Sequence, residues 1–115
     1  MPTFLVKQPG AEPLQVEVAD DQDAMYQALS RGVAGWLQHV TMVADGVKFD
    51  VWLNEEGKLL GLPINLRVPG DVFVGNLVMT GSDARTGKTL GLSEAQLEAA
   101  TKWATGKASK VEWMG

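Results

Sequence analysis

An aspartate–glycine pair, Asp45-Gly46, separates two stretches in which apolar residues alternate with polar ones. Alternation with a period of two is typical of a β-strand that has one buried face. Asp-Gly favours the positive φ angles of a two-residue type I′ turn, which joins adjacent antiparallel strands. The pattern therefore predicts a hairpin of residues 36–44 and 47–54, in which Ala44 faces Val47.

The predicted turn also fixes which side chains lie opposite one another. Met42 falls opposite Phe49 and Val40 opposite Val51, on the same face as Leu53. A shift of one residue would move Met42 and Val40 to the other face, because side chains alternate along a strand. Turn chemistry and hydrophobic pattern thus specify the same register.

The rest of the chain carries signals for further strands and for two helices. We expect helices after the acidic residues 20–23, ending at the glycines by residue 35, and from Ser93, ending at Gly106. Extended segments are predicted at residues 4–8, 14–18, 64–68 and 72–79, and residues 111–114 form either an edge strand or a loose tail.

These elements predict the fold class. Helices that are interspersed among hairpin-linked strands, without strict strand–helix–strand alternation, argue against a parallel sheet. We expect a single α+β domain over residues 1–115: an antiparallel, partly irregular sheet of about five or six strands, with two helices packed on it.

Four short motifs lie within residues 33–93: Val33-Ala34-Gly35-Trp36, Glu55-Glu56-Gly57, Leu62-Pro63-Ile64-Asn65 and Val74-Gly75. Together they resemble the motifs of the domain-of-unknown-function 3846 family, whose small members occur mainly in bacteriophages, plasmids and their bacterial hosts. Ala34 stands where the family has a glycine, and the segment after Asn65 is shorter than usual. The resemblance implies a phage-type accessory protein with no assigned activity.

Composition and charge exclude several classes of function. The chain has no cysteine, which excludes disulfides, thiol catalysis and cysteine-bound zinc. Its net charge of −4 and its lack of a basic cluster argue against nucleic-acid binding. It also lacks a long apolar run and a signal-peptide pattern. We therefore expect no membrane association and a location in the bacterial host cytoplasm.

Other motifs invite a catalytic interpretation and do not fit it. Five residues separate Gly81 from Gly87, whereas a phosphate-binding loop needs four, so we interpret this segment as a hairpin turn. Adjacent carboxylates such as Glu55-Glu56 point apart at an exposed turn, and the aspartates at 20–23 fit helix capping better than calcium binding. We expect no enzyme, no metal and no cofactor.

Five residues remain as a candidate binding surface: Trp52, His39, Asp50, Asn65 and Arg67. The hairpin register places His39 opposite Trp52, so it either stacks on that ring or acts as a general base oriented by Asp50. Asn65 and Arg67 share one face of an extended segment. Asn65 either satisfies nearby backbone groups or joins Arg67 in binding an anionic ligand or a partner carboxylate.

The four tryptophans are many for this length. We expect Trp36 and Trp103 to lie largely inside, and Trp52 and Trp113 to be partly exposed. Trp52 among polar neighbours has the composition of an interface centre with its rim. If the C-terminal helix covers this face instead, Trp52 is an ordinary core residue.

The sequence therefore predicts a phage-type accessory protein that acts as a non-catalytic binding module and modulates a host protein. The alternative is a protein that binds or sequesters a small molecule or nucleotide, or a small hydrolase built around Arg67, His39 and Asp50. The sequence is compatible with a monomer or a homo-oligomer, and it names no partner.

Overall fold

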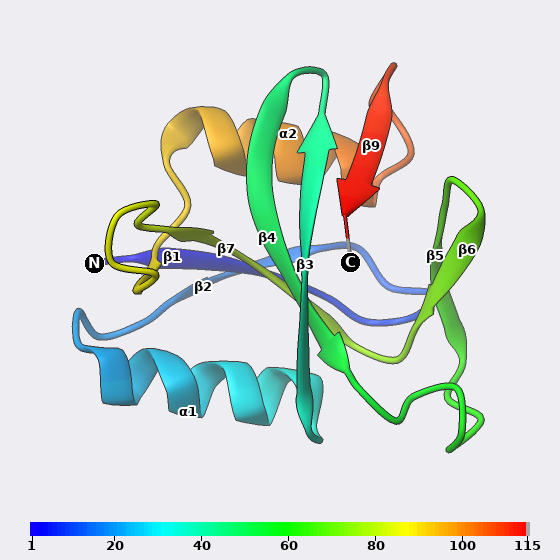
Figure 1. The fold of residues 1–115 in the computed structure, drawn as a ribbon, viewed down its shortest axis with the longest axis horizontal. Coiled ribbons are helices and arrows are strands. Elements are labelled where there is room, and N and C mark those ends of the chain that lie inside the picture. The colour runs from blue at the N-terminus through cyan, green and yellow to red at the C-terminus, as the bar shows by residue number, and fades with distance from the viewer. Residues whose placement is uncertain (115) are drawn as a thin grey trace.

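The computed structural model describes residues 1–114, which form an α+β domain with two helices and nine strands (Figure 1). In chain order the elements are β1 (Thr3–Lys7), β2 (Leu14–Glu17), α1 (Gln22–Val33), β3 (Leu37–Ala44), β4 (Val47–Asn54), β5 (Ile64–Val68), β6 (Asp71–Val74), β7 (Leu77–Ser82), β8 (Thr89–Leu90), α2 (Glu94–Ala104) and β9 (Val111–Met114).

The main sheet has seven strands, in the order β2-β1-β7-β4-β3-β9, with β8 paired to β7 beside this path. All of its strand pairs are antiparallel, and β5 and β6 form a separate two-stranded hairpin. The predicted α+β class is confirmed. The strand count is higher than expected because residues 111–114 form an edge strand, residues 89–90 form the short strand β8, and the predicted strand 72–79 is divided in two.

The central hairpin has the predicted register. Met42 pairs with Phe49 and Val40 with Val51, and the turn residues Asp45 and Gly46 have φ angles of 49° and 81°. Positive φ at both positions is the requirement of a type I′ turn, which explains why Asp-Gly occupies it.

The division between β6 and β7 falls at Gly75, whose φ is 75°. A Cβ atom added there would lie 2.8 Å from Leu62 Cδ1, and the positive φ itself favours glycine. A glycine inside a strand pattern is typical of a bulge or a close approach, and here the Leu62 side chain packs directly on Gly75. The break lets the chain leave the β5–β6 hairpin and enter the main sheet.

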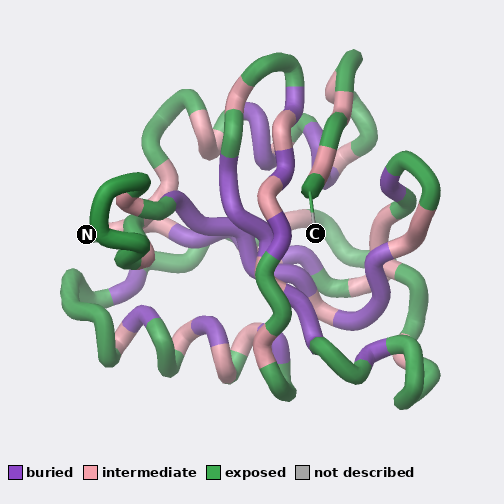
Figure 2. The backbone as a smooth tube through the Cα atoms, in the orientation of Figure 1, coloured by how far each residue is buried: buried purple, intermediate pink, exposed green. Residues whose placement is uncertain are grey.

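The two helices cover opposite faces of the sheet, and buried residues are concentrated in the strands between them (Figures 1 and 2). Trp103 and Ala100 of α2 pack in one cluster with Val40, Met42 and Phe49.

The α1 face has its own cluster, in which Met25, Leu29 and Val33 pack with Val78, and Trp52 packs against it. The face that carries Trp52 therefore lies under α1, and the proposed covering by the C-terminal helix is wrong.

Both helices begin at the predicted caps. The Asp21 side chain accepts a hydrogen bond from the Ala24 N–H, and Ser93 with Gln96 forms a complete capping box. Helix α1 ends at Val33, and Ala34 follows in the left-handed conformation with φ of 59°. Alanine thus occupies a position that glycine adopts without steric cost.

The loop after β4 differs from what its sequence indicates. Asn54-Glu55-Glu56-Gly57 favours a type I turn with a left-handed Gly57, but the positive φ lies at Gly61, and a Cβ atom on Gly57 would meet Val74 Cγ2 at 2.8 Å. Leu59 and Leu60 are apolar enough to begin a returning strand; instead they lie in successive turns and are exposed. The next strand begins only at Ile64, after these turns and Pro63.

Trp36 is the largest error among the predicted core residues, because 72% of it is exposed. It lies between Ala34 and the first residue of β3, where its carbonyl accepts a hydrogen bond from the Glu55 N–H at 2.8 Å. Its backbone is thereby held at the edge of the domain, and its side chain enters neither core cluster. Trp103 is buried and Trp52 and Trp113 are partly exposed, as predicted.

Neither of the helices in residues 1–114 has the length and apolar character needed to cross a lipid bilayer.

Candidate functional site

His39, Asp50 and Trp52 come together on the α1 face of the sheet. His39 Nε2 lies 2.9 Å from Asp50 Oδ1, and the His39 and Trp52 ring centroids are 4.9 Å apart at 41°. The Trp52 indole N–H donates to Thr80 Oγ1 at 2.9 Å. Both the stacking and the pairing with Asp50 follow from the hairpin register, which puts His39 opposite Trp52 and Thr41 opposite Asp50.

This group provides an oriented imidazole on the surface. His39 is exposed while Asp50 is buried, so the carboxylate can hold the ring in one orientation. The Thr80 hydroxyl is fully buried and accepts the hydrogen bond of the Trp52 indole N–H, and among residues 1–114 no hydroxyl group is hydrogen-bonded to His39. The polar contact of His39 is therefore with Asp50, and its imidazole remains accessible to solvent.

Asn65 connects the β5–β6 hairpin to the end of β1. Its Nδ2 donates to the carbonyls of Lys7 at 2.7 Å and Gly75 at 2.8 Å, and its Oδ1 accepts from Lys7 Nζ at 3.0 Å. This confirms that Asn65 satisfies backbone groups. Lys7, only 7% exposed, was not singled out in the sequence, although its place in an apolar strand was a signal for burial.

Arg67 lies away from the other candidate residues. It lines a hollow of about 390 Å³ together with Trp103 and Val111, which belong to the α2 face. His39 and Asp50 are on the α1 face. The structure thus does not assemble Arg67, His39 and Asp50 into one site.

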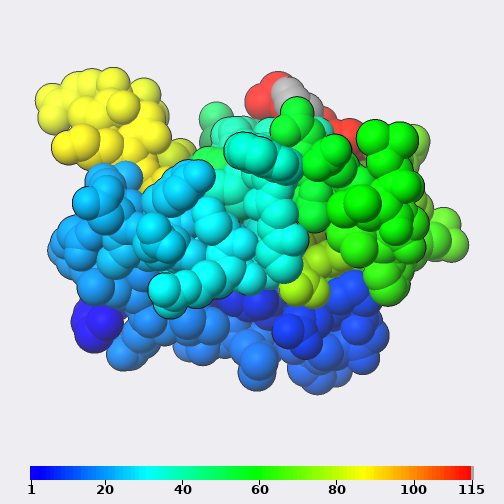
Figure 3. All heavy atoms as spheres, turned by 90° about the horizontal axis from the view of Figure 1, so that it is seen from below, coloured from blue at the N-terminus to red at the C-terminus, as the bar shows by residue number. Residues whose placement is uncertain are grey.

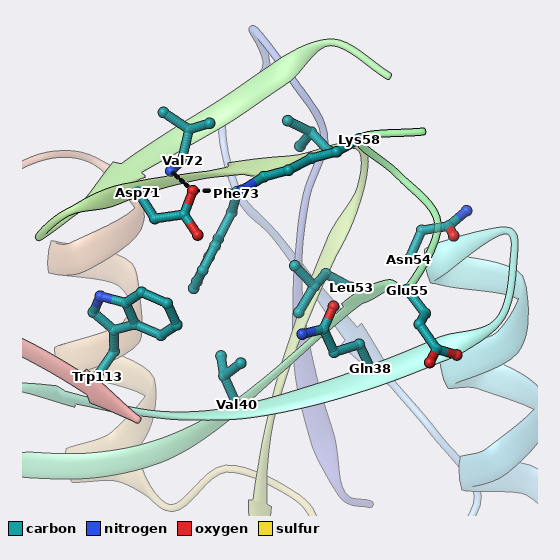
Figure 4. Close-up of a pocket in the computed structure, with 11 residues that line it drawn as sticks. Gln38, Val40, Leu53, Asn54, Glu55, Lys58, Asp71, Val72, Phe73 and Trp113 are labelled. Carbon is teal, nitrogen blue, oxygen red and sulfur yellow. Dashed lines mark hydrogen bonds and ion pairs between the residues drawn. The ribbon is translucent and has the colours of Figure 1, made fainter. Parts of the chain in front are cut away.

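A cavity of about 250 Å³ opens between the β3–β4 and β5–β6 hairpins (Figure 4). Its floor is apolar and its rim is polar. The side chains of the floor are Val40, Leu53, Phe73 and Trp113, and those of the rim are Gln38, Glu55, Lys58 and Asp71; Asn54, Val72 and Val74 complete the lining. The sequence did not predict this cavity, because two separate hairpins form its walls. No local sequence pattern indicates how far apart two hairpins lie.

Hydrogen bonds hold the walls of the cavity in place. The Trp113 indole N–H donates to the Pro69 carbonyl at 2.8 Å, and its ring meets Phe73 edge-on at 5.3 Å. Across the rim, Lys58 Nζ donates to Asp71 Oδ1. That bond, assisted by the Val72 N–H, lowers the pKa of Asp71 below its ordinary value of 3.8. Among residues 1–114, Glu55 has no ion-pair partner on this rim.

The first half of β3 forms an open edge beside the cavity. Strand β9 pairs with β3 only from Thr41 to Ala44, and within residues 1–114 no strand pairs with Leu37–Val40 on that side. In an antiparallel strand, successive backbone groups point to opposite neighbours.

Two hydrogen bonds at the ends of β3 show which residues face which side. The Glu55 N–H donates to the Trp36 carbonyl, on the β4 side, and the Asp45 N–H donates to the Lys110 carbonyl, on the β9 side. Because the backbone groups of successive residues point to alternate sides, the even-numbered residues from Trp36 face β4 and the odd-numbered residues up to Asp45 face the β9 side. The N–H and C=O groups of Leu37 and His39 therefore point to the open edge.

The turn at residues 83–87 does not form a phosphate cradle. Asp83 Oδ1 accepts hydrogen bonds from the N–H groups of Arg85 at 2.8 Å and Thr86 at 3.2 Å, so these donors are already occupied. The two bonds lower the pKa of Asp83. In the part of the chain that the structure describes, no three or more histidine, aspartate or glutamate side chains are grouped to hold a metal ion.

Residues 2–105 match the family described as Domain of unknown function (DUF3846). The chain belongs to this family, as its motifs suggested. No curated protein and no solved structure gives a significant match to the chain.

Proposed function

We propose that the chain is a non-catalytic binding module that docks on another protein through the start of β3. The observation that carries this proposal is the exposure of Trp36, 72% of which is in contact with solvent, immediately before an unpaired strand edge. Tryptophan is enriched at the energetic centres of protein interfaces, and exposed apolar patches with a polar rim mark interaction sites.

Neighbouring features fit the same role. Leu59 and Leu60, both exposed, lie in the loop that follows β4, and the backbone of that loop is tied to Trp36 through Glu55. In Figure 3 this loop (green) forms one end of the molecule, next to the end of α1 (cyan). Exposed apolar groups beside carboxylates form an apolar patch with a polar rim, which is the composition of an interface.

The biological setting of the proposal comes from the resemblance to phage, plasmid and bacterial proteins. In that setting the partner is a host protein in the bacterial cytoplasm, and binding by this phage-type accessory protein modulates it. The stacked pair of His39 and Trp52 lies on the same hairpin and supplies a second, polar contact.

Capture of partners from a bacterial host lysate tests the proposal. Trp36→Ala should weaken retention of the captured protein by about 2 kcal/mol or more, since hot-spot tryptophans contribute at that level. The same substitution should change the free energy of unfolding by no more than about 0.5 kcal/mol, because the side chain lies outside the core.

Leu90→Ala provides the matched control, because Leu90 is also an exposed apolar residue but lies on β8. It should leave capture unchanged. If Trp36→Ala retains every partner of the wild type at the same affinity, the proposed docking surface is wrong.

A second candidate function has one observation in its favour, the short His39–Asp50 contact. An imidazole oriented by a carboxylate is a general base in many hydrolases. Thermal melts with a panel of nucleotides and cyclic dinucleotides test this candidate. A ligand-specific rise in Tm that disappears in His39→Asn would favour small-molecule binding or hydrolysis over protein binding.

A further inference from the structure

We propose that the open edge of β3 takes up an extended segment of the partner protein as an added antiparallel strand. In this arrangement an apolar side chain of the segment enters the cavity shown in Figure 4, and a cationic side chain two residues later reaches Glu55. The inference rests on the proposed function and specifies the form of the partner.

The backbone of β3 is prepared for such a strand. The N–H and C=O groups of Leu37 and His39 point to the side on which β9 pairs with Thr41 and the residues that follow. An added strand that lies in line with β9 would receive and donate hydrogen bonds at both residues.

Side-chain directions connect this edge to the cavity. Gln38 and Val40 line the cavity, and Trp113 of β9 lines it from the same face of the sheet. Because residues directly opposite one another share a face, a residue opposite Gln38 on the added strand also points towards the cavity. There it meets the apolar floor formed by Val40, Leu53, Phe73 and Trp113.

The volume of the cavity suits one side chain. A cavity of about 250 Å³ is smaller than the pockets of roughly 300–1,000 Å³ that bury most of a drug-sized ligand. Phenylalanine and leucine are of a size to fill most of it. An aromatic or branched apolar residue of a peptide is therefore a better occupant than a nucleotide.

The charges on the rim favour a cation. Asp71 is already paired with Lys58, whereas Glu55 has no ion pair among the described residues. Residues two apart on a strand share a face. A lysine or arginine two positions after the apolar residue of the added strand therefore lies on the cavity side, where its side chain can extend towards the Glu55 carboxylate. A second copy of the chain fits less well, because residues 37–40 contain no lysine or arginine.

The blocked peptide acetyl-Thr-Phe-Thr-Arg-Thr-amide is a direct probe, followed by amide chemical shifts of the isotope-labelled protein. We expect saturable shifts at millimolar peptide for the amides of Leu37 and His39 and for the indole N–H of Trp113. A peptide with glutamate in place of arginine should bind at least about fivefold more weakly, because it faces Glu55 with a like charge.

Two variants of one residue separate backbone pairing from side-chain contact. His39→Pro removes the N–H that points to the open edge but leaves the bonds to β4, which come from Gln38 and Val40. His39→Ala retains that N–H. Both variants lack the imidazole, so the comparison isolates the backbone N–H, and we expect His39→Pro to bind the peptide at least about fivefold more weakly than His39→Ala.

Several results would overturn the inference. They are the absence of saturable shifts at millimolar peptide, equal binding by His39→Pro and His39→Ala, or a dimer in sedimentation whose Leu37 and His39 amides are protected without peptide. If the peptide fails while capture still depends on Trp36, the added-strand mode is wrong and the protein-binding function stands. If both fail, the proposed function fails as well.

Discussion

Asn65 and Lys7 hold each other by hydrogen bonds in both directions, although 58 residues separate them in the sequence. Lys7 Nζ donates to Asn65 Oδ1 at 3.0 Å, and Asn65 Nδ2 donates to the Lys7 carbonyl at 2.7 Å. A further bond from Asn65 Nδ2 reaches the Gly75 carbonyl at 2.8 Å. These three bonds fix the β5–β6 hairpin, and with it one wall of the cavity, to the main sheet.

Replacing Asn65 should therefore be costly. Asn65→Ala removes all three bonds, one of them from the buried Lys7 ammonium, and we expect the free energy of unfolding to fall by about 2–4 kcal/mol. Urea unfolding measures this effect. Gln8→Ala, at an exposed neighbouring position, should change stability by less than about 0.5 kcal/mol. A similarly small effect of Asn65→Ala would show that the three bonds contribute little.

Ala34→Gly should stabilise the protein. Ala34 is exposed and has a φ of 59°, where an alanine side chain costs about 1 kcal/mol or more relative to glycine. Part of this gain is offset by the greater freedom of glycine in the unfolded chain, so we expect a net gain of about 0.5–1 kcal/mol in urea unfolding.

Ala95→Gly is the control for this substitution, because Ala95 is exposed within helix α2. Glycine in a helix is less stable than alanine by roughly 0.5–1 kcal/mol, so Ala95→Gly should destabilise the protein. A loss of stability in Ala34→Gly of the same size would contradict the left-handed conformation at residue 34.

Two tryptophan substitutions distinguish surface from core. Trp103 is only 5% exposed and its ring lies 5.8 Å from Phe49 and 6.1 Å from Phe73. Trp103→Ala should lower the free energy of unfolding by about 3–5 kcal/mol. Trp36→Ala should leave it within about 0.5 kcal/mol of the wild type. Equal effects of the two substitutions in urea melts would place Trp36 in the core, where the sequence pattern predicted it.

The Lys58–Asp71 bond predicts a pH dependence. Because the bond lowers the pKa of Asp71 below 3.8 in the folded state, its contribution to stability is complete above the ordinary pKa. That contribution is lost as the pH falls through the lowered pKa. In urea melts, the stability difference between the wild type and Asp71→Asn should therefore be constant above about pH 5 and shrink at lower pH. A difference that grows as the pH falls would contradict this sign.

The sequence predicted the parts of the fold that depend on local chemistry. The Asp45-Gly46 turn sets the hairpin register, and that register alone places His39 beside Trp52. The helix caps at Asp21 and Ser93 were also predictable, because each depends on residues within three positions.

The remaining features depend on distant segments. The role of Asn65 requires Lys7, and the cavity requires Trp113 to approach Phe73 across two hairpins. Trp36 is exposed because it lies between the end of α1 and the start of β3. At such a boundary the direction of the chain decides which way a side chain points, and the residue type does not indicate that direction.

The open edge of β3 is the feature on which the proposed binding mode depends, and amide hydrogen exchange of the free protein tests it most directly. The N–H groups of Gln38 and Val40 point to β4, whereas those of Leu37 and His39 point to the open edge. We predict that Leu37 and His39 exchange at least ~100-fold faster than Gln38 and Val40, because only the latter pair is hydrogen-bonded. Equal protection of all four amides would show that this edge is already occupied and would contradict the account.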